Sequence, residues 1–376
     1  MKLSAKITSI AGSQTVAFTT VIQKLRAEGR QIIDLAVGEP QFDTPAPIID
    51  ATQNALAAQK TRYSPVKGLS DLRTQLAAQF EGCDINNILI TNGSKQALYM
   101  IFQVICDPAD EVIIPVPFWV SFVEQVKLAG GRPVPVVTQR HQLDVDAIEQ
   151  AVSPRTKAIL INSPNNPSGA VYPMNDLQKI VRLAEDHDLF IVADEAYKEF
   201  VYDGSVYASI FDIAPARERL IVTRSFSKSY SMTGFRIGYV AAPGNIIAAL
   251  SKMQSHLTGN VCTFAQYGAL AALQLDDDWL ADRQSRLQQK KDTAFVSVSR
   301  LFDCIQPQGA FYLFPDVSTA LRNDDTSETL ARRLLKEAGV AVVPGEAFGM
   351  ARHLRISFAV SDENLKTGLK RIAEVL

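Results

Sequence analysis

The most informative segment of the chain is Ser225-Phe226-Ser227-Lys228-Ser229-Tyr230-Ser231-Met232-Thr233-Gly234-Phe235-Arg236-Ile237-Gly238-Tyr239. It follows the apolar run 220–223 and leads into a second apolar run, 237–241, and no helical period separates the two. This pattern predicts two buried strands that are joined by a loop. Lys228 lies in that loop.

Lys228 is an unusual residue between two core strands, because burying a long, hydrated cation costs conformational entropy and desolvation energy. An amine that is buried near a second cation loses proton affinity and becomes a nucleophile for carbonyl carbon. Arg236 is a candidate for that cation, and its donors and nearby hydroxyls such as Ser225 suit an anion carried beside an aldehyde. These features describe a site for pyridoxal phosphate. The alternative is a solvated surface loop in which Lys228 and Arg236 have no chemical role.

Length and composition indicate a globular protein that acts on small molecules. With 376 residues the chain exceeds the usual limit for one core, so we expect a large domain and a smaller one. A net charge of -2 gives no electrostatic footprint for nucleic acid or for a membrane surface. Residues 1–7 lack the apolar core of a signal peptide, and no apolar run approaches membrane-spanning length, so we expect a cytoplasmic protein.

The cysteines and histidines are too scattered to form a metal site or a disulfide scaffold. They are Cys83, Cys106, Cys262, Cys304, His141, His187, His256 and His353. We expect no bound metal.

Strand-like and helix-like segments alternate through the middle of the chain, which predicts an α/β fold with a mainly parallel, seven-stranded sheet covered by helices on both faces. The expected strands are 88–91, 112–116, 134–137, 158–162, 190–193, 220–223 and 237–241. Ligands are then expected at the carboxyl ends of these strands.

Three domain segments are expected. Residues 40–270 form the large cofactor-binding domain, and residues 271–376 form a small α+β domain, with strands near 311–314, 339–343 and 354–359. Residues 1–39, which contain a helix at 18–28 and a strand at 32–36, pack with the small domain.

A candidate anion site follows the expected strand 88–91, where Asn92-Gly93-Ser94-Lys95-Gln96 opens a long helix. The free N–H groups and the positive end of that helix point at whatever lies there. The glycine spacing does not match a Walker loop, which favours a phosphate over a nucleotide.

Three further residues are candidates with a structural alternative. Gly38 follows a strand and lets the backbone approach a ligand, or it simply makes a turn. Tyr63 lies in a polar loop and can pack under it. Trp119 lies beyond the end of a strand, where it either stacks on a planar ring or packs in the core.

Asn166 and Asp194 follow neighbouring strands. A rigid proline loop displays the Asn166 amide. An acid such as Asp194 at a buried strand end must be paired, either with a protonated pyridine nitrogen or, as a helix N-cap, with backbone N–H groups. Tyr197 lies three positions further and can reach the same ligand.

Arg355 stands in an otherwise apolar strand, Leu354-Arg355-Ile356-Ser357-Phe358. An arginine there is costly unless it has an anionic partner. It is therefore a candidate clamp for a substrate carboxylate, with a structural salt bridge to Asp or Glu as the alternative.

Seven motifs resemble those of the class I aminotransferases among the fold-type I pyridoxal phosphate enzymes, and they follow the family's order over nearly the whole chain. They are Val37-Gly38-Glu39-Pro40, Asn92-Gly93-Ser94-Lys95-Gln96, Ser163-Pro164-Asn165-Asn166-Pro167-Ser168-Gly169, Asp194-Glu195-Ala196-Tyr197, Ser225-Phe226-Ser227-Lys228, Gly234-Phe235-Arg236-Ile237-Gly238-Tyr239 and Leu354-Arg355-Ile356-Ser357.

The resemblance implies a role for each residue. Lys228 would hold the cofactor as a Schiff base and then carry the proton between the substrate α-carbon and the cofactor. Asp194 would keep the pyridine nitrogen protonated, Tyr197 and Asn166 would donate to the ring phenolate oxygen, and Trp119 would stack on the ring.

The resemblance also implies which residues hold the cofactor phosphate and the substrate α-carboxylate. The phosphate would be held by Gly93, Ser94, the Lys95 backbone, Ser225, Arg236 and, from the second subunit of a homodimer with shared sites, Tyr63. The substrate α-carboxylate would be held by Arg355, Asn166 and the Gly38 backbone, with Trp119 beside it.

Within the family the chain is most similar to the bacterial-type aspartate aminotransferases of subgroup Ib. Lys95 matches the lysine that contacts the distal carboxylate of a dicarboxylic substrate. Ser13 and Thr15 match the N-terminal segment that closes over the substrate.

Two positions depart from the family pattern. Gln41 replaces a usual acid, and Gly259-Asn260-Val261 stands where a hydroxyl and a proline are common. The second departure removes an expected cross-subunit contact with the phosphate, which Thr258 would have to replace.

The predicted reaction is ping-pong transfer of the amino group of an acidic L-amino acid to a 2-oxo acid such as 2-oxoglutarate. Aromatic, methionine-like or prephenate substrates are the alternative, because an aromatic-walled pocket discriminates weakly between apolar side chains. A lyase or decarboxylase on the same fold is another. A non-catalytic domain of a transcription regulator would need a basic DNA-binding region, for which this chain has neither the length nor the charge.

Overall fold

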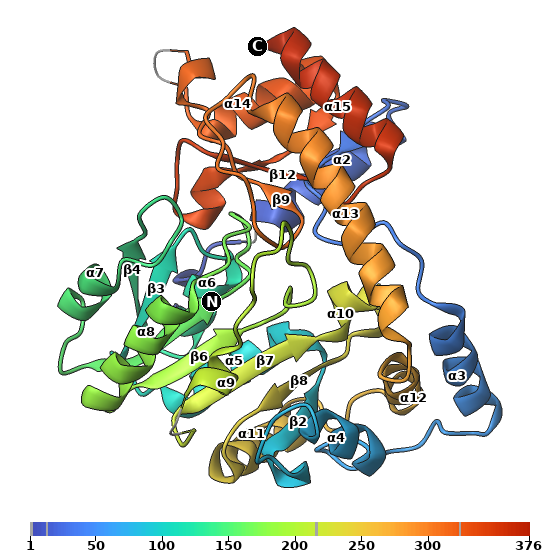
Figure 1. Cartoon of the computed structure of the whole chain (residues 1–376), viewed down its shortest axis with the longest axis vertical. Helices are drawn as coiled ribbons and strands as arrows, with labels where there is room; N and C mark the ends of the chain where they lie inside the picture. The colour runs from blue at the N-terminus through green and yellow to red at the C-terminus, as the bar shows by residue number, and fades with distance from the viewer. Residues whose placement is uncertain (1–2, 13, 215–216, 323–324) are drawn as a thin grey trace.

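In the computed structural model, residues 3–12, 14–214, 217–322 and 325–376 are described. Within them, seven strands form the central sheet in the order β2-β8-β7-β6-β5-β3-β4 (Figure 1). The strands are β2 Ile88–Thr91, β3 Glu111–Val116, β4 Arg132–Val137, β5 Thr156–Asn162, β6 Phe190–Asp194, β7 Leu220–Ser225 and β8 Gly238–Ala241. Only β8 runs antiparallel to its neighbours β2 and β7 among these described strands. The predicted mainly parallel, seven-stranded sheet is confirmed.

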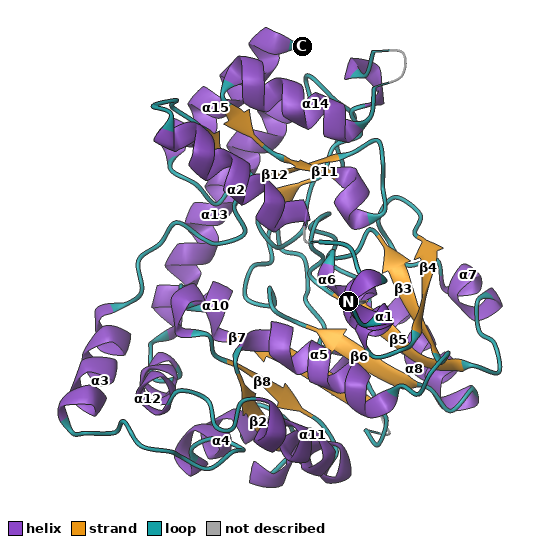
Figure 2. Ribbon diagram, turned by 180° about the vertical axis from the view of Figure 1, so that it is seen from behind, coloured by secondary structure: helices purple, strands orange, loops and turns teal. Residues whose placement is uncertain are grey.

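Helices cover both faces of this sheet (Figure 2). Side chains of a strand point alternately to its two faces, so Ile159 and Ile161 pack into one hydrophobic cluster and Leu160 into the other. The strands therefore look apolar along their whole length. The helices on the Leu160 face are α5 Gly93–Ile105, α6 Ser121–Leu128 and α11 Gly244–Leu257. Those on the other face include α4 Ser70–Ala77, α7 Val145–Gln150, α8 Met174–Asp186 and α12 Thr263–Ala272, which packs against α3 Ala46–Ala57.

The two ends of the chain meet in a second hydrophobic core. Strand β1 Ile33–Asp34 pairs in parallel with β10 Val340–Ala341, and β9 Tyr312–Leu313, β11 Val343–Pro344 and β12 Leu354–Ser357 form an antiparallel sheet. Figure 1 shows the blue α2 among the orange and red helices at the top. These helices are α2 Gln14–Ala27, α13 Asp277–Val298, α14 Ser327–Arg333 and α15 Asp362–Val375. The expected domain boundaries stay predictions.

The segments that the sequence misjudged are short. Residues Phe226–Ser229 form a one-turn helix, α10, where a loop was predicted, and a 3-10 turn follows at Thr233–Phe235. A single turn is too short to show a helical period. The expected strand 339–343 is divided between β10 and β11, because each half pairs with a different sheet. Two further short α-helices are α1 Ala5–Thr8 and α9 Ile210–Ile213.

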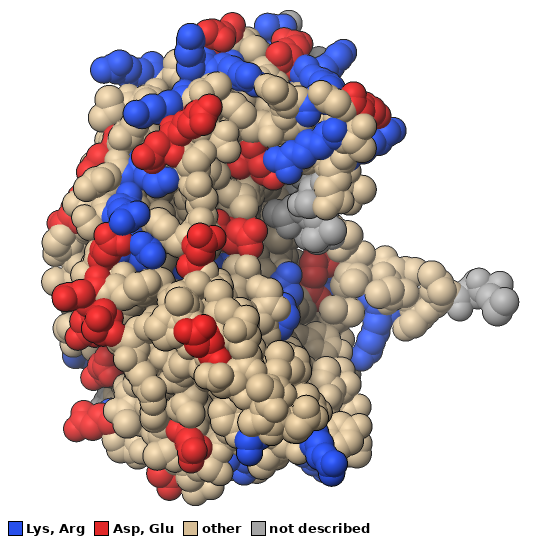
Figure 3. Space-filling model, turned by 90° about the vertical axis from the view of Figure 1, so that its right-hand side faces the viewer, with Lys and Arg blue, Asp and Glu red and all other residues tan. Residues whose placement is uncertain are grey.

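The surface shows mixed charge. On the face drawn in Figure 3, acidic and basic side chains are interspersed, and neither sign covers an extended area of that face. Among the described residues, none of the helices combines the length and the apolar character that crossing a membrane requires.

Candidate active site

A cavity of about 710 Å³ lies where β5, β6 and β7 end, at the carboxyl edge of the sheet. Tyr312 reaches this cavity from the second hydrophobic core, and Trp119 reaches it from the side of the central sheet. The predicted residues that line it are Gly38, Ser94, Lys95, Trp119, Asn166, Asp194, Tyr197, Ser225, Lys228, Arg236 and Arg355.

Lys228 enters the cavity from α10. The Ser225 hydroxyl accepts a hydrogen bond from the Ser227 N–H at 3.1 Å and so begins this helix. The turn directs the Lys228 amine to the carbonyl oxygen of Gly38, to which it donates at 2.5 Å. The Lys228 side chain is half-buried and lines the cavity, which argues against a fully solvated loop at this residue, whereas Arg236 is exposed. The chemical roles of both residues stay predictions.

Burial lowers the pKa of Lys228 to about 8. The Glu39 carboxylate opposes this shift, whereas the positive charges of Arg236, Arg355 and Lys95 add to it. Near neutral pH a useful fraction of the amine is then unprotonated, which is the nucleophilic form.

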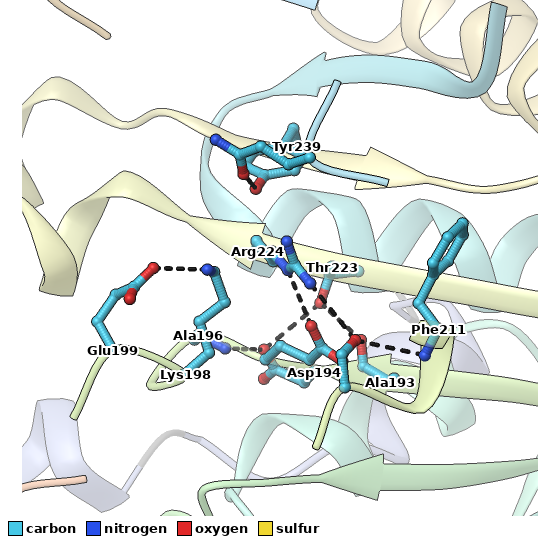
Figure 4. A network of polar contacts seen from close by, with 12 residues as sticks. Ala193, Asp194, Ala196, Lys198, Glu199, Phe211, Thr223, Arg224 and Tyr239 are labelled. Carbon is cyan, nitrogen blue, oxygen red and sulfur yellow. Dashed lines mark hydrogen bonds and ion pairs between the residues drawn. The ribbon is translucent and has the colours of Figure 1, made fainter. Parts of the chain in front are cut away.

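Asp194 ends β6 and lines the cavity, and Figure 4 shows its contacts with Ala196 and Thr223. Its Oδ1 accepts hydrogen bonds from the Ala196 N–H at 3.2 Å and from the Thr223 hydroxyl at 3.4 Å. Residues 196–199 form turns, so Asp194 is not the N-cap of a regular helix. Burial raises the pKa of Asp194 to about 7, although both hydrogen bonds oppose the shift. A buried acid of this kind is suited to a cationic partner.

The first turn of α5 forms one end of the cavity. The N-cap residue Asn92 makes no side-chain capping bond with any described residue, so the N–H groups of this turn lack that partner. Ser94 and Lys95 line the cavity at this point. The arrangement fits the predicted anion site at a helix N-terminus, which stays a prediction.

Two glycines allow the protein to pack tightly behind that anion site. A Cβ on Gly238 would lie 2.6 Å from the main-chain nitrogen of Ser94, and a Cβ on Gly93 would lie 2.6 Å from Nη2 of Arg236. Gly93 also has a φ of +78°, which favours glycine. Arg236 donates to the carbonyl oxygen of Thr233 at 2.8 Å, which holds its guanidinium beside the helix start.

Asn166 connects the two sides of the cavity. Its Nδ2 donates to the Tyr197 hydroxyl at 3.3 Å, and its own N–H donates to Oδ1 of Asn162 at 3.0 Å. The hydroxyls of Tyr197 and Tyr312 lie 3.1 Å apart. Burial raises the pKa of Tyr197 well above its ordinary value, and Tyr312 adds to the shift. Tyr197 therefore remains a hydrogen-bond donor.

Arg355 on β12 closes the cavity from the second core. It donates to Oδ1 of Asn166 at 3.0 Å and to the carbonyl oxygen of Ala36 at 2.8 Å, and its guanidinium stacks 4.3 Å from the Tyr312 ring. These partners are neutral oxygens, not the carboxylate that the salt-bridge alternative requires. Its Nε is buried without a hydrogen-bond partner among the described residues. A ligand carboxylate would suit this guanidinium.

Lys95 and Trp119 lie together on another wall. The Lys95 amine is 4.9 Å from the centre of the Trp119 ring, and Trp119 packs edge-to-face on Phe122. Burial lowers the pKa of Lys95, and Arg236 adds to the shift. Trp119 thus both packs in the core and lines the cavity.

Among the described residues, the predicted Tyr63 and Gly93 do not line the cavity of their own chain. The Tyr63 side chain is 97% exposed. Thr15 belongs to α2, and Ser13 lies outside the described residues. Asn260 donates to Ser64, beside Tyr63, at 3.1 Å.

The Thr258 hydroxyl accepts a hydrogen bond from Gln96 Nε2 at 2.9 Å. This contact ties Thr258 to α5, whose first turn forms the anion site. A contact between Thr258 and a phosphate stays a prediction.

Sequence reasoning missed several residues of the cavity. Asn162 ends the strand next to Asp194, so the same strand-end rule would have found it. Tyr312 carries no such signal, because it lies in an apolar run that reads only as a core strand. The other missed lining residues are Asp34, Ala36, Val37, Glu39 and Ala196. Ser227 and Thr233, whose hydroxyls belong to the lysine loop that suits an anion, also line the cavity.

Comparison with known proteins gives a consistent result. Residues 30–372 match the model of the family described as aminotransferase class I and II. The chain is 39% identical over 385 residues to the aspartate aminotransferase of Geobacillus stearothermophilus, which covers 99% of this chain and 98% of that protein. It is 38% identical over 386 residues to the aspartate/prephenate aminotransferase of Thermus thermophilus, which covers 100% of this chain and 98% of that protein. A solved structure of aspartate aminotransferase from Thermus thermophilus with maleate is similar, with a TM-score of 0.95, 38% identity and 100% of both chains covered.

Proposed function

The chain belongs to the aminotransferase class I and II family, and from this premise we propose that it uses pyridoxal phosphate to move the amino group of aspartate or glutamate to a 2-oxo acid such as 2-oxoglutarate. The enzyme transfers amino groups, and the substrates of such enzymes are amino acids and 2-oxo acids. The observation that carries the proposal is a single cavity that holds the Lys228 amine, the buried Asp194 carboxylate and the anion site of α5.

The residues of the cavity fit this cofactor. The N–H groups of α5 and the Arg236 guanidinium would hold its phosphate, and Asp194 would face its protonated ring nitrogen. Tyr197 and Asn166 would donate hydrogen bonds to its phenolate oxygen. When bound, pyridoxal phosphate supplies an aldehyde for amines and a ring that withdraws electrons from the substrate α-carbon.

The chain's own residues would perform the remaining steps. The Lys228 amine would take the proton from the substrate α-carbon onto its Nζ and would deliver it to the cofactor carbon that bears the amino group. Arg355 would orient the substrate by its α-carboxylate, and Trp119 would exclude water from one side of the ring.

Lys95 supports an acidic substrate. Its amine lies in the same cavity as Arg355, so two cations are available for two carboxylates. Curated relatives are named aspartate aminotransferases, and the similar solved structure with maleate is that of an aspartate aminotransferase with a dicarboxylate. A second candidate is prephenate or an aromatic substrate, because other relatives are named aspartate/prephenate aminotransferases and Trp119 and Tyr312 line the cavity.

A panel of amino donors, with prephenate as an additional amino acceptor, tests the proposal. The purified enzyme, loaded with pyridoxal phosphate, is assayed with aspartate, glutamate, phenylalanine and prephenate, each with a suitable oxo-acid or amino-acid partner. We expect aspartate or glutamate to react fastest and Lys228→Ala to lose at least about 1,000-fold in rate. A reaction rate with phenylalanine far above the rate with aspartate would overturn the assignment of an acidic substrate. Release of ammonia or carbon dioxide without an acceptor would indicate a lyase or decarboxylase.

The homodimer with shared sites remains part of the proposal. The exposed Tyr63 supports it, because that side chain is free to reach another subunit. The cytoplasmic location also stays a prediction.

A further inference from the structure

Arg224 and Glu195 form a buried ion pair next to Asp194, near the ends of β6 and β7. Figure 4 shows Arg224 beside Thr223 and Asp194. Arg224 Nε donates to Glu195 Oε2 at 2.8 Å, and the side chains are only 8% and 4% exposed. The other carboxylate oxygen of Glu195 accepts from the Ser209 hydroxyl at 2.6 Å, which also accepts from Arg224 Nη2 at 3.4 Å. The three side chains form a closed set of hydrogen bonds.

Stability alone does not account for this pair. The Arg224 guanidinium lies 4.2 Å from the Phe80 ring, in a region where Phe80 and Phe211 belong to the hydrophobic core. Removing two charges from water is costly, and an apolar pair of similar volume is often at least as stable. The retention of a buried ion pair at this position therefore favours a role in the neighbouring cavity.

The pair is adjacent to the cavity in sequence and in space. Glu195 directly follows Asp194, and Arg224 directly precedes Ser225. Because successive side chains of an extended chain point to opposite faces, Asp194 and Ser225 line the cavity while Glu195 and Arg224 meet behind it. The ion pair thus joins the ends of β6 and β7.

The ion pair also affects the electrostatic environment of the Asp194 carboxylate. The Glu195 carboxylate is one of the groups that raise the pKa of Asp194, after burial. Glu195 and its neighbours in turn raise the pKa of Arg224, although burial opposes this, so Arg224 stays protonated. The guanidinium of Arg224 holds the opposite charge 2.8 Å from Glu195, so removal of either member alone would leave an unpaired charge next to Asp194.

We propose that the Arg224–Glu195 ion pair is a positioning unit for Asp194, which fixes the ends of β6 and β7 and keeps the electrostatic field behind the cofactor ring balanced. The inference rests on the proposed cofactor-dependent function. It assigns no chemical step to either residue.

Other titratable groups surround the pair. Lys198, Glu199, Asp212 and Asp277 line the same pocket as Glu195 and Arg224, and Lys198 and Glu199 form an ion pair of their own at 2.6 Å. Tyr207 and Tyr239 face the ion pair, and burial raises the pKa of both, so they stay neutral. Lys228 faces Asp194 from α10 and is the group whose linkage to the cofactor reports the field. Charge variants of Glu195 and Arg224 are therefore expected to act in opposite directions.

The test is a pH titration of the visible absorption of the cofactor-loaded enzyme. Glu195→Gln leaves Arg224 uncompensated, so the positive field should lower the midpoint of the absorption change by about half a pH unit. Arg224→Met leaves Glu195 uncompensated and should raise the midpoint by a similar amount, about half a pH unit. The double variant should return close to the wild-type midpoint, and Arg224→Lys should retain it.

The matched control is Arg332→Met, which breaks the exposed ion pair of Arg332 with Glu328 and should leave the midpoint unchanged. The inference would be overturned if the absorption midpoint shifted in the same direction in Glu195→Gln and Arg224→Met, or if it shifted in neither variant. If Arg224→Met does not fold, the double variant decides, since it must lie nearer the wild type than Glu195→Gln does. A wild-type protein that neither transaminates nor binds the cofactor would instead refute the proposed function.

Discussion

The guanidinium of Arg355 donates a hydrogen bond to Oδ1 of Asn166 at 3.0 Å, although 189 residues separate the two in the sequence. The contact joins β12 of the second core to the loop that follows β5 of the central sheet. Asn166 also donates to Tyr197, so one amide connects the proposed carboxylate clamp with the proposed ring contacts.

Replacing Arg355 should impair substrate binding. Arg355→Met removes two charge-assisted hydrogen bonds to the substrate carboxylate, so kcat/KM for aspartate should fall about 1,000-fold. Arg355→Lys keeps the charge but loses the planar fork of donors. Its kcat/KM for aspartate should therefore lie between those of wild type and Arg355→Met. Steady-state kinetics measure the effect. A kcat/KM within a fewfold of wild type in Arg355→Met would contradict the clamp.

Replacing Lys95 should change substrate preference. Lys95→Gln removes the cation proposed for the distal carboxylate, so kcat/KM for aspartate should fall about 100-fold while that for phenylalanine changes little. The measured quantity is the ratio of the two values. An equal loss for both substrates would mean that Lys95 supports the site in general and does not select acidic substrates.

Replacing Gly238 should weaken the anion site. A Cβ there would lie 2.6 Å from the Ser94 nitrogen and would push β8 away from the start of α5. We expect Gly238→Ala to raise the Kd for pyridoxal phosphate at least about tenfold, because the helix N–H groups move out of register with the phosphate. Titration of the cofactor-free protein measures it. Gly234→Ala is the control, since a Cβ at Gly234 would meet nothing within 4 Å among the described residues.

Asp194 should make the stability of the cofactor-free protein depend on pH. Its pKa is about 7 in the folded protein, against an ordinary value near 4 in the unfolded chain. Its contribution to the free energy of unfolding is therefore complete below about pH 4 and is lost as the pH rises through 7. Relative to wild type, Asp194→Asn should gain about 3 kcal/mol between pH 5 and pH 8, as measured by urea unfolding.

The exposed Asp50 on α3 provides the control for that measurement. Asp50→Asn should follow the wild-type pH dependence. A parallel course for wild type and Asp194→Asn would mean that the Asp194 carboxylate is already ionised at pH 5 in the folded protein.

Much of the fold was predictable because buried parallel strands leave a simple pattern. Strand β2, at Ile88–Thr91, has the predicted bounds, since all of its side chains are buried and apolar or small. The one-turn helix α10 was not predictable, because it depends on a single cap by Ser225. Likewise, only tertiary pairing separates β10 from β11.

The candidate site was predictable where a polar residue follows an apolar strand. Asp194 and Asn166 were found in this way, and Arg355 was found because it interrupts one. The contact of Lys228 with the Gly38 carbonyl was not predictable, since it joins segments 190 residues apart. The pairing of Glu195 with Arg224 also depends on the register of β6 and β7.

The pairing of β1 with β10 constrains the order in which the protein can fold during translation. Ile33 leaves the ribosome long before its partner Val340 is made, so the apolar N-terminal segment must wait while the central sheet takes shape. Arg355 emerges later still. A nascent chain would therefore complete the sheet edge that carries Asp194 and Lys228 before Arg355, the proposed carboxylate clamp, is synthesised.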